Sequence, residues 1–276
     1  MCPSSGHLWK EEELNAMYID DPVKLLKKVR DLTLMAVNDE QYMVIACDSD
    51  GGIGSKPYDT VKVPEEILAQ FAVRVPLFEL VSCGAKPFMV IDCLAVEMDP
   101  SGEKILAEIK QYVREAGITD DIQFTGSSEE NVPTVQSGIG VTILGLADRK
   151  GFPVGASRGE DQVVCVGIPK SGPDYDIHPD DPDIVTLREL IELRKSAVVH
   201  DLLPAGSKGV QYEAEELARS VGKVFVGRPD VSLDLKQSAG PATCVLLTCG
   251  ENDLHIINKL VHSPVTVIGE LKEPGV

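Results

Sequence analysis

The sequence predicts an α/β (α+β) protein of two domains, because short apolar strands and amphipathic helices are mixed in each half of the chain. The chain has 276 residues, of which 43% are hydrophobic and 25% are charged. That length suits one large domain or two ordinary ones, and the composition is typical of a soluble globular protein. No short internal repeat is visible, which favours a mixed fold over a solenoid.

The first half of the chain predicts two long helices and five strands. The first helix has Pro64 at its first position, and Gly84 follows its last turn. Apolar side chains recur at helical spacing in both helices. The predicted helices are 63–84 and 102–117, and the predicted strands are 32–36, 42–46, 87–98, 121–126 and 138–147.

A polar, glycine-rich stretch at 148–161, "DRKGFPVGASRGED", predicts a domain boundary. We therefore expect a polar N-terminal arm over residues 1–29, a first domain over 30–148 and a second domain over 149–276. The second domain is predicted to contain strands 162–169, 224–227, 243–248 and 265–270, and helices 182–197, 210–221 and 251–261.

The net charge limits the partners that this protein can bind, and the cysteines indicate the cellular compartment. A formal net charge of −18 argues against non-specific binding to nucleic acid or to an anionic membrane. Seven cysteines, an odd number without C-x-x-C spacing, indicate a reducing cytoplasm rather than a disulfide framework. The chain shows no apolar signal segment and no apolar run of membrane-spanning length, so we expect a cytoplasmic protein.

The common short motifs of nucleotide and metal sites do not occur. The chain contains no G-x-x-x-x-G-K-[ST] phosphate loop, and no G-x-G-x-x-G follows a predicted strand. Neither C-x-x-C nor H-E-x-x-H is present, which argues against a dedicated zinc site.

Carboxylates at the ends of predicted elements are the main chemical signal. Asp48 and Asp50 follow the strand 42–46, and their spacing of two places both on one side of an extended chain. Further acids stand at other element ends, namely Glu79, Glu129, Glu130 and Asp201. If the strands are neighbours, these acids converge on a Mg²⁺ site, which needs only one or two carboxylates besides substrate phosphates. The alternative is that they are ordinary surface acids, of which the chain has many.

The glycines after Asp50 allow two interpretations. Gly52 and Gly54 either form a plain turn or let backbone N–H groups approach phosphate oxygens, with Lys56 as a point charge. Residue types alone do not decide between the two.

Several segments together resemble one enzyme superfamily. "GIGSK" at 52–56 resembles the "GVGTK" signature of aminoimidazole ribonucleotide synthetases, and "ELVSCGAKPFMVIDCLAVE" resembles the helix-to-strand junction of that superfamily. "FTGSSEENVPT" followed by "GIGVTILG" takes the place of its Gly-Gly-acid-Thr segment. "VVHDLLPAGSKGV" and the C-terminal "SAGPATCVLLTCGENDLHIINKL" also occur in the expected order. The resemblance covers residues 30 to 272.

The resemblance implies a two-domain aminoimidazole ribonucleotide synthetase-like fold, in which strands of the N-terminal domain pair across a homodimer. It also implies ATP and Mg²⁺ as cofactors. "RDLTL", "ACDSDGGIG", "TGSSEENVPT" and "HDLLPAGSKG" look most like the α-ribazole kinase branch. Those enzymes phosphorylate the ribose 5′-hydroxyl of the lower-ligand nucleoside of cobamides.

The site residues are carried over position by position. The implied metal ligands are Asp31, Asp48, Asp50, Glu79 and Glu129. Either Asp48 or Asp50 matches one aspartate of the family, and Glu79 matches another. The implied catalytic residues are Asp201, Asp50 and Glu130, where Asp201 binds metal, orients the nucleoside or acts as the base. The implied nucleotide contacts are Gly52, Gly54, Ser55, Lys56, Gly126, Ser127 and Ser128.

One departure keeps other functions open. Ser127 stands where the family has an acid, and Glu129 and Glu130 are candidates to replace it or are solvated loop residues. The alternatives are another kinase or cyclase of the superfamily, similar to thiamine-monophosphate kinase or to the synthetase itself, and a non-catalytic ATP-binding regulator.

Overall fold

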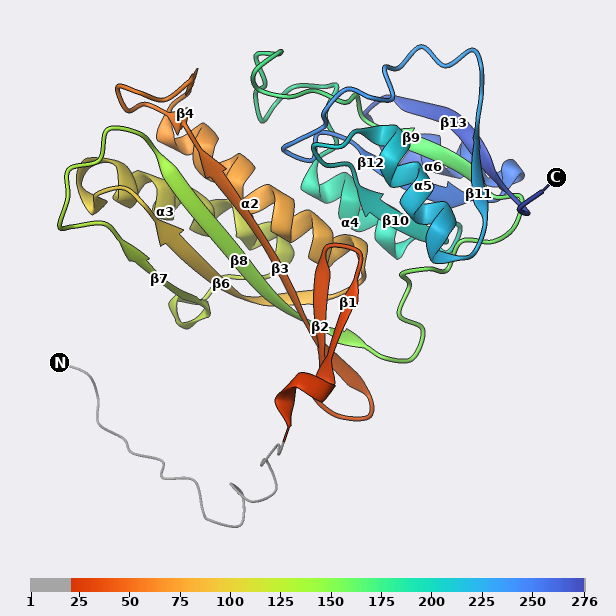
Figure 1. Ribbon diagram of the computed structural model, residues 1–276, viewed down its shortest axis with the longest axis horizontal. Helices are drawn as coiled ribbons and strands as arrows, with labels where there is room; N and C mark the ends of the chain where they lie inside the picture. Colours follow the sequence, from red (N-terminus) through yellow and green to blue (C-terminus); the bar gives the residue numbers. More distant parts are fainter. Residues whose placement is uncertain (1–20, 276) are drawn as a thin grey trace.

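The first domain is built on a six-stranded sheet. The computed structural model describes residues 21–275, and the sheet has the strand order β1-β2-β3-β8-β6-β7 (Figure 1). Only β6 and β7 pair in parallel, and the other neighbours are antiparallel. The strands are β1 (Leu26–Val29), β2 (Leu32–Ala36), β3 (Gln41–Gly51), β6 (Lys86–Leu94), β7 (Phe124–Ser128) and β8 (Gly138–Asp148).

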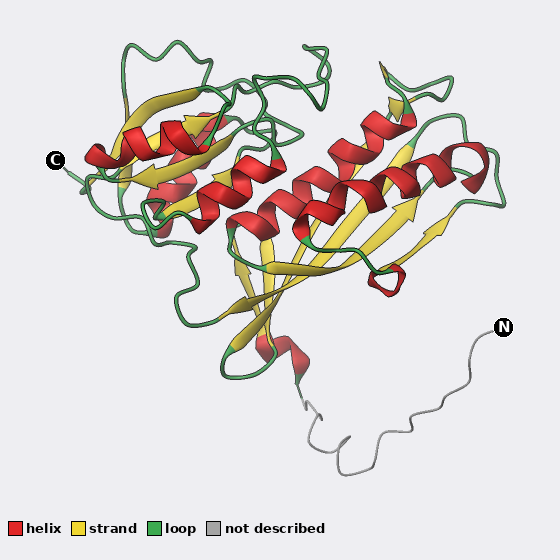
Figure 2. Cartoon of the chain, turned by 180° about the vertical axis from the view of Figure 1, so that it is seen from behind, coloured by secondary structure: helices red, strands yellow, loops and turns green. Residues whose placement is uncertain are grey.

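Helices α2 (Glu65–Ser82) and α3 (Glu103–Tyr112) cover one face of this sheet, as Figure 2 shows from behind. Among residues 21–275 no element lies over the opposite face, which is in front in Figure 1. Helix α2 is apolar on nearly all sides because it packs between the sheet and the second domain. It ends before Gly84, whose φ of +74° gives the left-handed conformation expected after a helix.

The second domain packs helices α4 (Leu187–Lys195), α5 (Val210–Ser220) and α6 (Leu254–Leu260) on a five-stranded sheet. The strand order is β10-β12-β9-β13-β11. Its strands are β9 (Gln162–Val166), β10 (Asp201–Pro204), β11 (Val224–Gly227), β12 (Val245–Cys249) and β13 (Val265–Lys272). The two large sheets divide the chain between β8 and β9, while the buried cluster from Leu32 to Val261 runs through both domains.

Short elements connect these parts. A two-stranded sheet joins β4 (Ile53–Gly54) to β5 (Val61–Lys62), and single helical turns lie at Pro22–Leu25, Met98–Gly102, Val113–Ala116, Asp121–Gln123 and Glu251–Asp253. No helix within residues 21–275 is both long and apolar enough to cross a membrane.

Two predictions about local structure are wrong. The strand predicted at 42–46 continues to Gly51, because β3 pairs with β8 along its whole length and its backbone groups stay hydrogen-bonded past the apolar stretch. Residues 26–29, assigned to the arm, form β1 and pair with β2. The first 20 residues of the predicted arm lie outside the described residues.

Candidate active site

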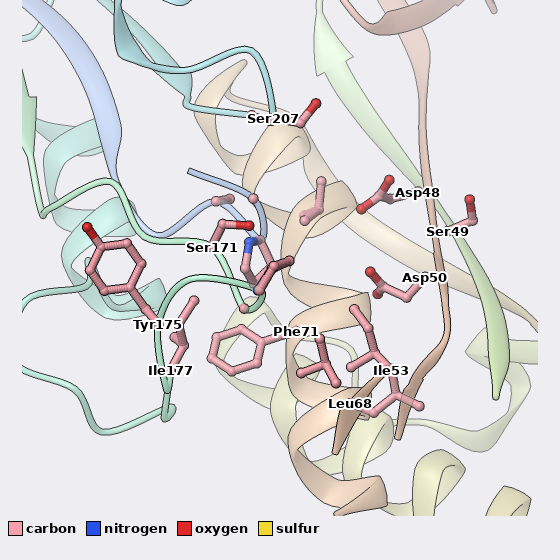
Figure 3. A pocket seen from close by; sticks show the side chains of 18 of the residues that line it. Asp48, Ser49, Asp50, Ile53, Leu68, Phe71, Ser171, Tyr175, Ile177 and Ser207 are labelled. Atoms are coloured by element: carbon pink, nitrogen blue, oxygen red, sulfur yellow. The ribbon is translucent and has the colours of Figure 1, made fainter. Parts of the chain in front are cut away.

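A cavity of about 1170 Å³ lies between the two domains. Its walls come from β3 and α2 of the first domain, from the loop 171–177, from the turn between β10 and α5, and from residues 240–242. Figure 3 shows Asp48 and Asp50 on the same side of the cavity as Ile53 and Leu68, with Tyr175 and Ile177 on the other side. The volume slightly exceeds that of a typical single-ligand pocket, so two small molecules or a large one fit.

Asp48 and Asp50 enter this cavity from β3. The burial pattern of the strand alternates, and both acids share the side of buried Val44 and Ala46, which faces α2. The prediction that a spacing of two places them on one side is confirmed. They lie within the strand rather than after it, so the pleat of β3 holds their direction.

Asp31 and Glu79 join them in the cavity wall. Asp31 follows the tight turn at Arg30, whose φ is +52°, and Glu79 lies in the last turns of α2. The structure thus brings together four of the five acids that were expected to bind metal.

Glu213 of α5 also lines the cavity, and the sequence analysis missed it. It lies in the first turn of α5, four residues after Gly209, and is buried. A signal was available, because an acid in the first turn of a helix lies close to the turn that precedes the helix, and this turn resembled a family motif. Only the tertiary structure shows that Glu213 lies close to Asp31 of the first domain.

The charges of these acids affect one another. Burial, together with the nearby Asp31 and Glu213, raises the pKa of Glu79 to about 8. Burial and Asp31 raise the pKa of Glu213 to about 7, and burial and Asp48 raise that of Asp50 to about 6. The cavity therefore concentrates negative charge that a cation would relieve.

The turn between β10 and α5 adds a positive group. Ser207 and Lys208 line the cavity beside the N-terminus of α5, where backbone N–H groups favour an anion. Lys208 donates a hydrogen bond to the Tyr212 hydroxyl at 3.1 Å. Gly209 has a φ of +83°, and a Cβ there would lie 2.9 Å from the Gln237 carbonyl oxygen, so the turn requires glycine.

These donors fit Mg²⁺ that is bound together with a phosphorylated ligand. Within residues 21–275, no group of three or more His, Cys, Asp or Glu side chains is arranged to hold a metal ion by itself. Mg²⁺ usually takes one or two carboxylates and completes its shell with phosphate oxygens and water. The hard oxygen donors and the crowded charge suit such a shared site.

Asp201 does not line the cavity. It is the first residue of β10, is 1% exposed, and accepts hydrogen bonds from Arg30 and from the backbone N–H of Gly155 and Leu202. Its oxygens are thus occupied by structural partners. His200 beside it is paired with Asp161 at 2.8 Å.

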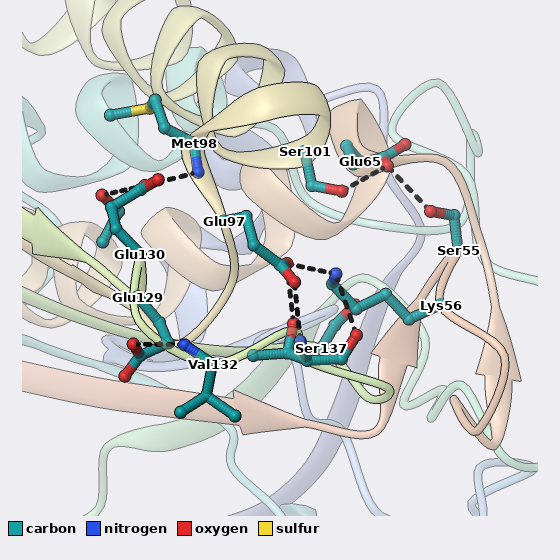
Figure 4. Close-up of polar contacts among 12 residues, drawn as sticks. Ser55, Lys56, Glu65, Glu97, Met98, Ser101, Glu129, Glu130, Val132 and Ser137 are labelled. Atoms are coloured by element: carbon teal, nitrogen blue, oxygen red, sulfur yellow. Dashed lines mark hydrogen bonds and ion pairs between the residues drawn. The ribbon is translucent and has the colours of Figure 1, made fainter.

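The glycine loop also lies away from the cavity, except for Ile53. Lys56 pairs with Glu97, and Ser55 donates a hydrogen bond to Glu65 at 2.7 Å (Figure 4). A Cβ on Gly54 would lie 2.4 Å from the Ser137 hydroxyl, and Gly52 adopts a φ of +74°. These contacts explain the glycines by local packing.

The segment 126–130 lies on and after the edge strand β7, also outside the cavity. Glu129 accepts hydrogen bonds from the backbone of Asn131 and Val132, and Glu130 accepts them from Met98 N–H and the Ser128 hydroxyl (Figure 4). Ser127 faces solvent, and a Cβ on Gly126 would lie 2.2 Å from the Asp92 carbonyl oxygen. In this structure the segment therefore lies outside the cavity that Asp48 and Glu79 line.

One family of known proteins matches the first part of the chain in sequence. Residues 29–147 match the family described as AIR synthase related protein, N-terminal domain. No curated protein matches the chain in sequence.

Solved structures match over most of the chain at low identity. The hydrogenase maturation protein HypE in complex with ATP is 18% identical, with a TM-score of 0.61 over 84% of this chain and 77% of its own. Thiamine-monophosphate kinase from Stenotrophomonas maltophilia K279a is 14% identical, with a TM-score of 0.59 over 90% and 89%. AaThiL complexed with AMPPCP and TMP is 14% identical, with a TM-score of 0.59 over 88% and 84%. The protein therefore shares the fold of these solved structures, and residues 29–147 match the AIR synthase related N-terminal domain family in sequence.

Proposed function

We propose that this protein is an ATP- and Mg²⁺-dependent small-molecule kinase that phosphorylates the ribose 5′-hydroxyl of α-ribazole. The observation that carries the proposal is the convergence of Asp31, Asp48, Asp50 and Glu79 on one interdomain cavity. Support for a nucleotide comes from two of the matched structures, which hold ATP or AMPPCP. The nucleoside is proposed from the resemblance of the sequence motifs.

The residues have distinct roles in this proposal. Mg²⁺ bound to Asp31, Asp48, Asp50 or Glu79 would neutralise charge on the phosphates. Lys208 and the N-terminus of α5 bind phosphate oxygens from the second domain. Asp50, with a pKa of about 6, is also suited to accept the proton of the attacking hydroxyl. Phosphoryl transfer requires little more of the protein than this positioning and charge compensation.

A homodimer is part of the proposal. The face of the first sheet opposite α2 carries partly exposed apolar side chains on its three central strands. These are Met43, Ile45, Ile91, Leu144 and Leu146. A contiguous apolar face of this kind is typical of an interaction surface, and a second copy of the sheet is the partner that the family resemblance implies.

A non-catalytic ATP-binding regulator is the second candidate. It is favoured by the buried ion pair between Asp201 and Arg30, and by Ser127, which stands where the family has an acid. Such a protein binds ATP with Mg²⁺ but transfers no phosphoryl group.

The test is a mass-resolved kinase assay with purified protein, ATP and Mg²⁺. α-Ribazole, thiamine monophosphate and formylglycinamidine ribonucleotide are offered in parallel. A phosphate-sized mass gain on α-ribazole alone supports the proposal, and a gain on thiamine monophosphate alone contradicts the substrate. Release of ADP and phosphate without a phosphorylated product indicates a cyclase. ATP binding without turnover of any of the three supports the regulator.

A further inference from the structure

One row of side chains on α2 divides the cavity into two chemical halves. Ile67, Phe71, Val75 and Glu79 recur every four residues and all line the cavity. The row spans about 18 Å at the rise of an α-helix. Its first three members are apolar and its last is an acid, so polarity changes along the length of the cavity.

The facing walls add apolar side chains to the cavity, which is also lined by the charged Lys62, Asp174 and Asp176. Asp48 and Asp50 precede Ile53 along the chain, and Ile53 lies beside Leu68 at the apolar end in Figure 3. From the second domain, Tyr175 and Ile177 line the same cavity as Phe71. We name these five side chains, Ile53, Leu68, Phe71, Tyr175 and Ile177, the apolar wall.

The second-domain part of the wall is held by a closed loop. Lys170 pairs with both Asp181 and Asp183 at 2.7 Å, which ties together the two ends of the loop that carries Tyr175 and Ile177. Gln237 donates a hydrogen bond to Asp174 at 3.2 Å, and Ile177 is buried. Tyr175 remains 44% exposed, so its ring is available to a ligand.

We infer that the apolar wall receives the base of the nucleoside and selects a planar base with few polar edge groups, such as a benzimidazole, over a purine with amino or keto substituents. This inference rests on the proposed function, which places the reacting hydroxyl at the acidic half. A base one sugar away then lies against Phe71 and Tyr175. Aromatic rings there supply stacking area, whereas the polar edge of a purine would lose its hydrogen bonds to water without regaining them.

The first experiment compares two α-linked ribonucleosides that differ only in the base, 5,6-dimethylbenzimidazole or adenine. We expect kcat/KM to be at least about tenfold higher for the benzimidazole nucleoside, as expected for a desolvated polar edge. In Phe71→Asn and Tyr175→Ala we expect that preference to shrink, mainly through a higher KM, while Phe71→Leu retains most of it. Ile122→Ala, at a residue 83% exposed and outside the cavity, is the matched control. An adenine nucleoside used equally well by the wild type overturns the inference.

A binding measurement separates failure of the inference from failure of the proposed function. Calorimetry with free 5,6-dimethylbenzimidazole requires no catalysis, and we expect binding to the wild type and to Ile122→Ala but at least about tenfold weaker binding to Phe71→Asn. If that holds while no nucleoside is phosphorylated, the proposed kinase function fails and the base site stands. If the base does not bind, or if Phe71→Asn weakens AMPPCP binding instead, the apolar wall does not hold the substrate base. Thermal unfolding of each folded variant shows whether a loss is local.

Discussion

Arg30 holds Asp201 with both of its terminal nitrogens, at 3.1 Å from Oδ1 and 2.6 Å from Oδ2. The side chains are 7% and 1% exposed, so the pair is buried between the β1–β2 turn and the second domain. The same turn carries Asp31 into the cavity. An aspartate that the sequence suggested for catalysis therefore fixes the position of another acid.

Arg30→Ala should lower the free energy of unfolding by about 3–5 kcal/mol, because it leaves the buried Asp201 carboxylate without its cation. Urea denaturation measures the change. Asp121→Asn removes the exposed pair with Lys110 and should leave the free energy of unfolding nearly unchanged. An equally small loss in Arg30→Ala would mean that Asp201 is free for another role.

Asp50→Asn should reduce ATP turnover by on the order of a hundredfold or more, since it removes a charge that helps to hold Mg²⁺ and a proton acceptor. The variant should fold, because the side chain keeps its size. Initial rates measured over a range of Mg²⁺ concentrations test this. Glu129→Gln, at a residue outside the cavity, is the control, and it should retain turnover. Unchanged turnover and Mg²⁺ dependence in Asp50→Asn would remove Asp50 from the site.

The stability of the protein should fall as pH rises toward 8. The pKa of Glu79 is raised from 4.5 to about 8, mainly by burial, so the folded state binds a proton that the unfolded chain has lost. The contribution of Glu79 to the free energy of unfolding is fully present below pH 4.5 and is lost as pH rises through about 8. Asp50 and Glu213 act in the same direction.

Urea denaturation at several pH values between 5 and 8 measures this slope. Glu79→Gln should flatten it, because the amide does not ionise. Added Mg²⁺ should stabilise the wild type more at pH 8 than at pH 5. An identical pH slope in Glu79→Gln would contradict the raised pKa.

Two lysines make it possible to distinguish the two candidate phosphate sites, the cavity and the glycine loop. Lys208 lines the cavity, whereas Lys56 is paired with Glu97 outside it. Lys208→Met should raise the KM for ATP by about tenfold, since it removes a charge-assisted phosphate contact. Lys56→Met should change that KM less than twofold. The opposite order would show that the nucleotide binds at the glycine loop.

The open face of the first sheet should mediate dimerisation. The wild type should sediment as a dimer, and Ile91→Asp should shift it to monomer because a charge is then buried against the apolar partner face. Ile122→Asp, on an exposed turn away from the sheet, should remain a dimer. Sedimentation equilibrium gives the mass in each case, and a monomeric wild type would refute the proposal.

Much of the local structure could be predicted because it depends on neighbours in the chain. The helical period of apolar side chains defines α3, and Gly84 and Gly117 end helical segments with a positive φ. The spacing of Asp48 and Asp50 determines that they point the same way in any extended chain. The end of β3 could not be predicted, since pairing with β8 extends it through polar residues.

The sequence by itself therefore determined the mixed fold, most elements and the common direction of Asp48 and Asp50, because backbone geometry imposes the periods of helix and strand. Only the tertiary structure decided which acids share a cavity. Glu79 and Glu213 are far apart in the chain and meet because α2 packs against the second domain, while Arg30 withdraws Asp201 from the same region. Which acids meet depends on the packing of segments far apart in the chain. The residue type at any one position therefore does not predict it.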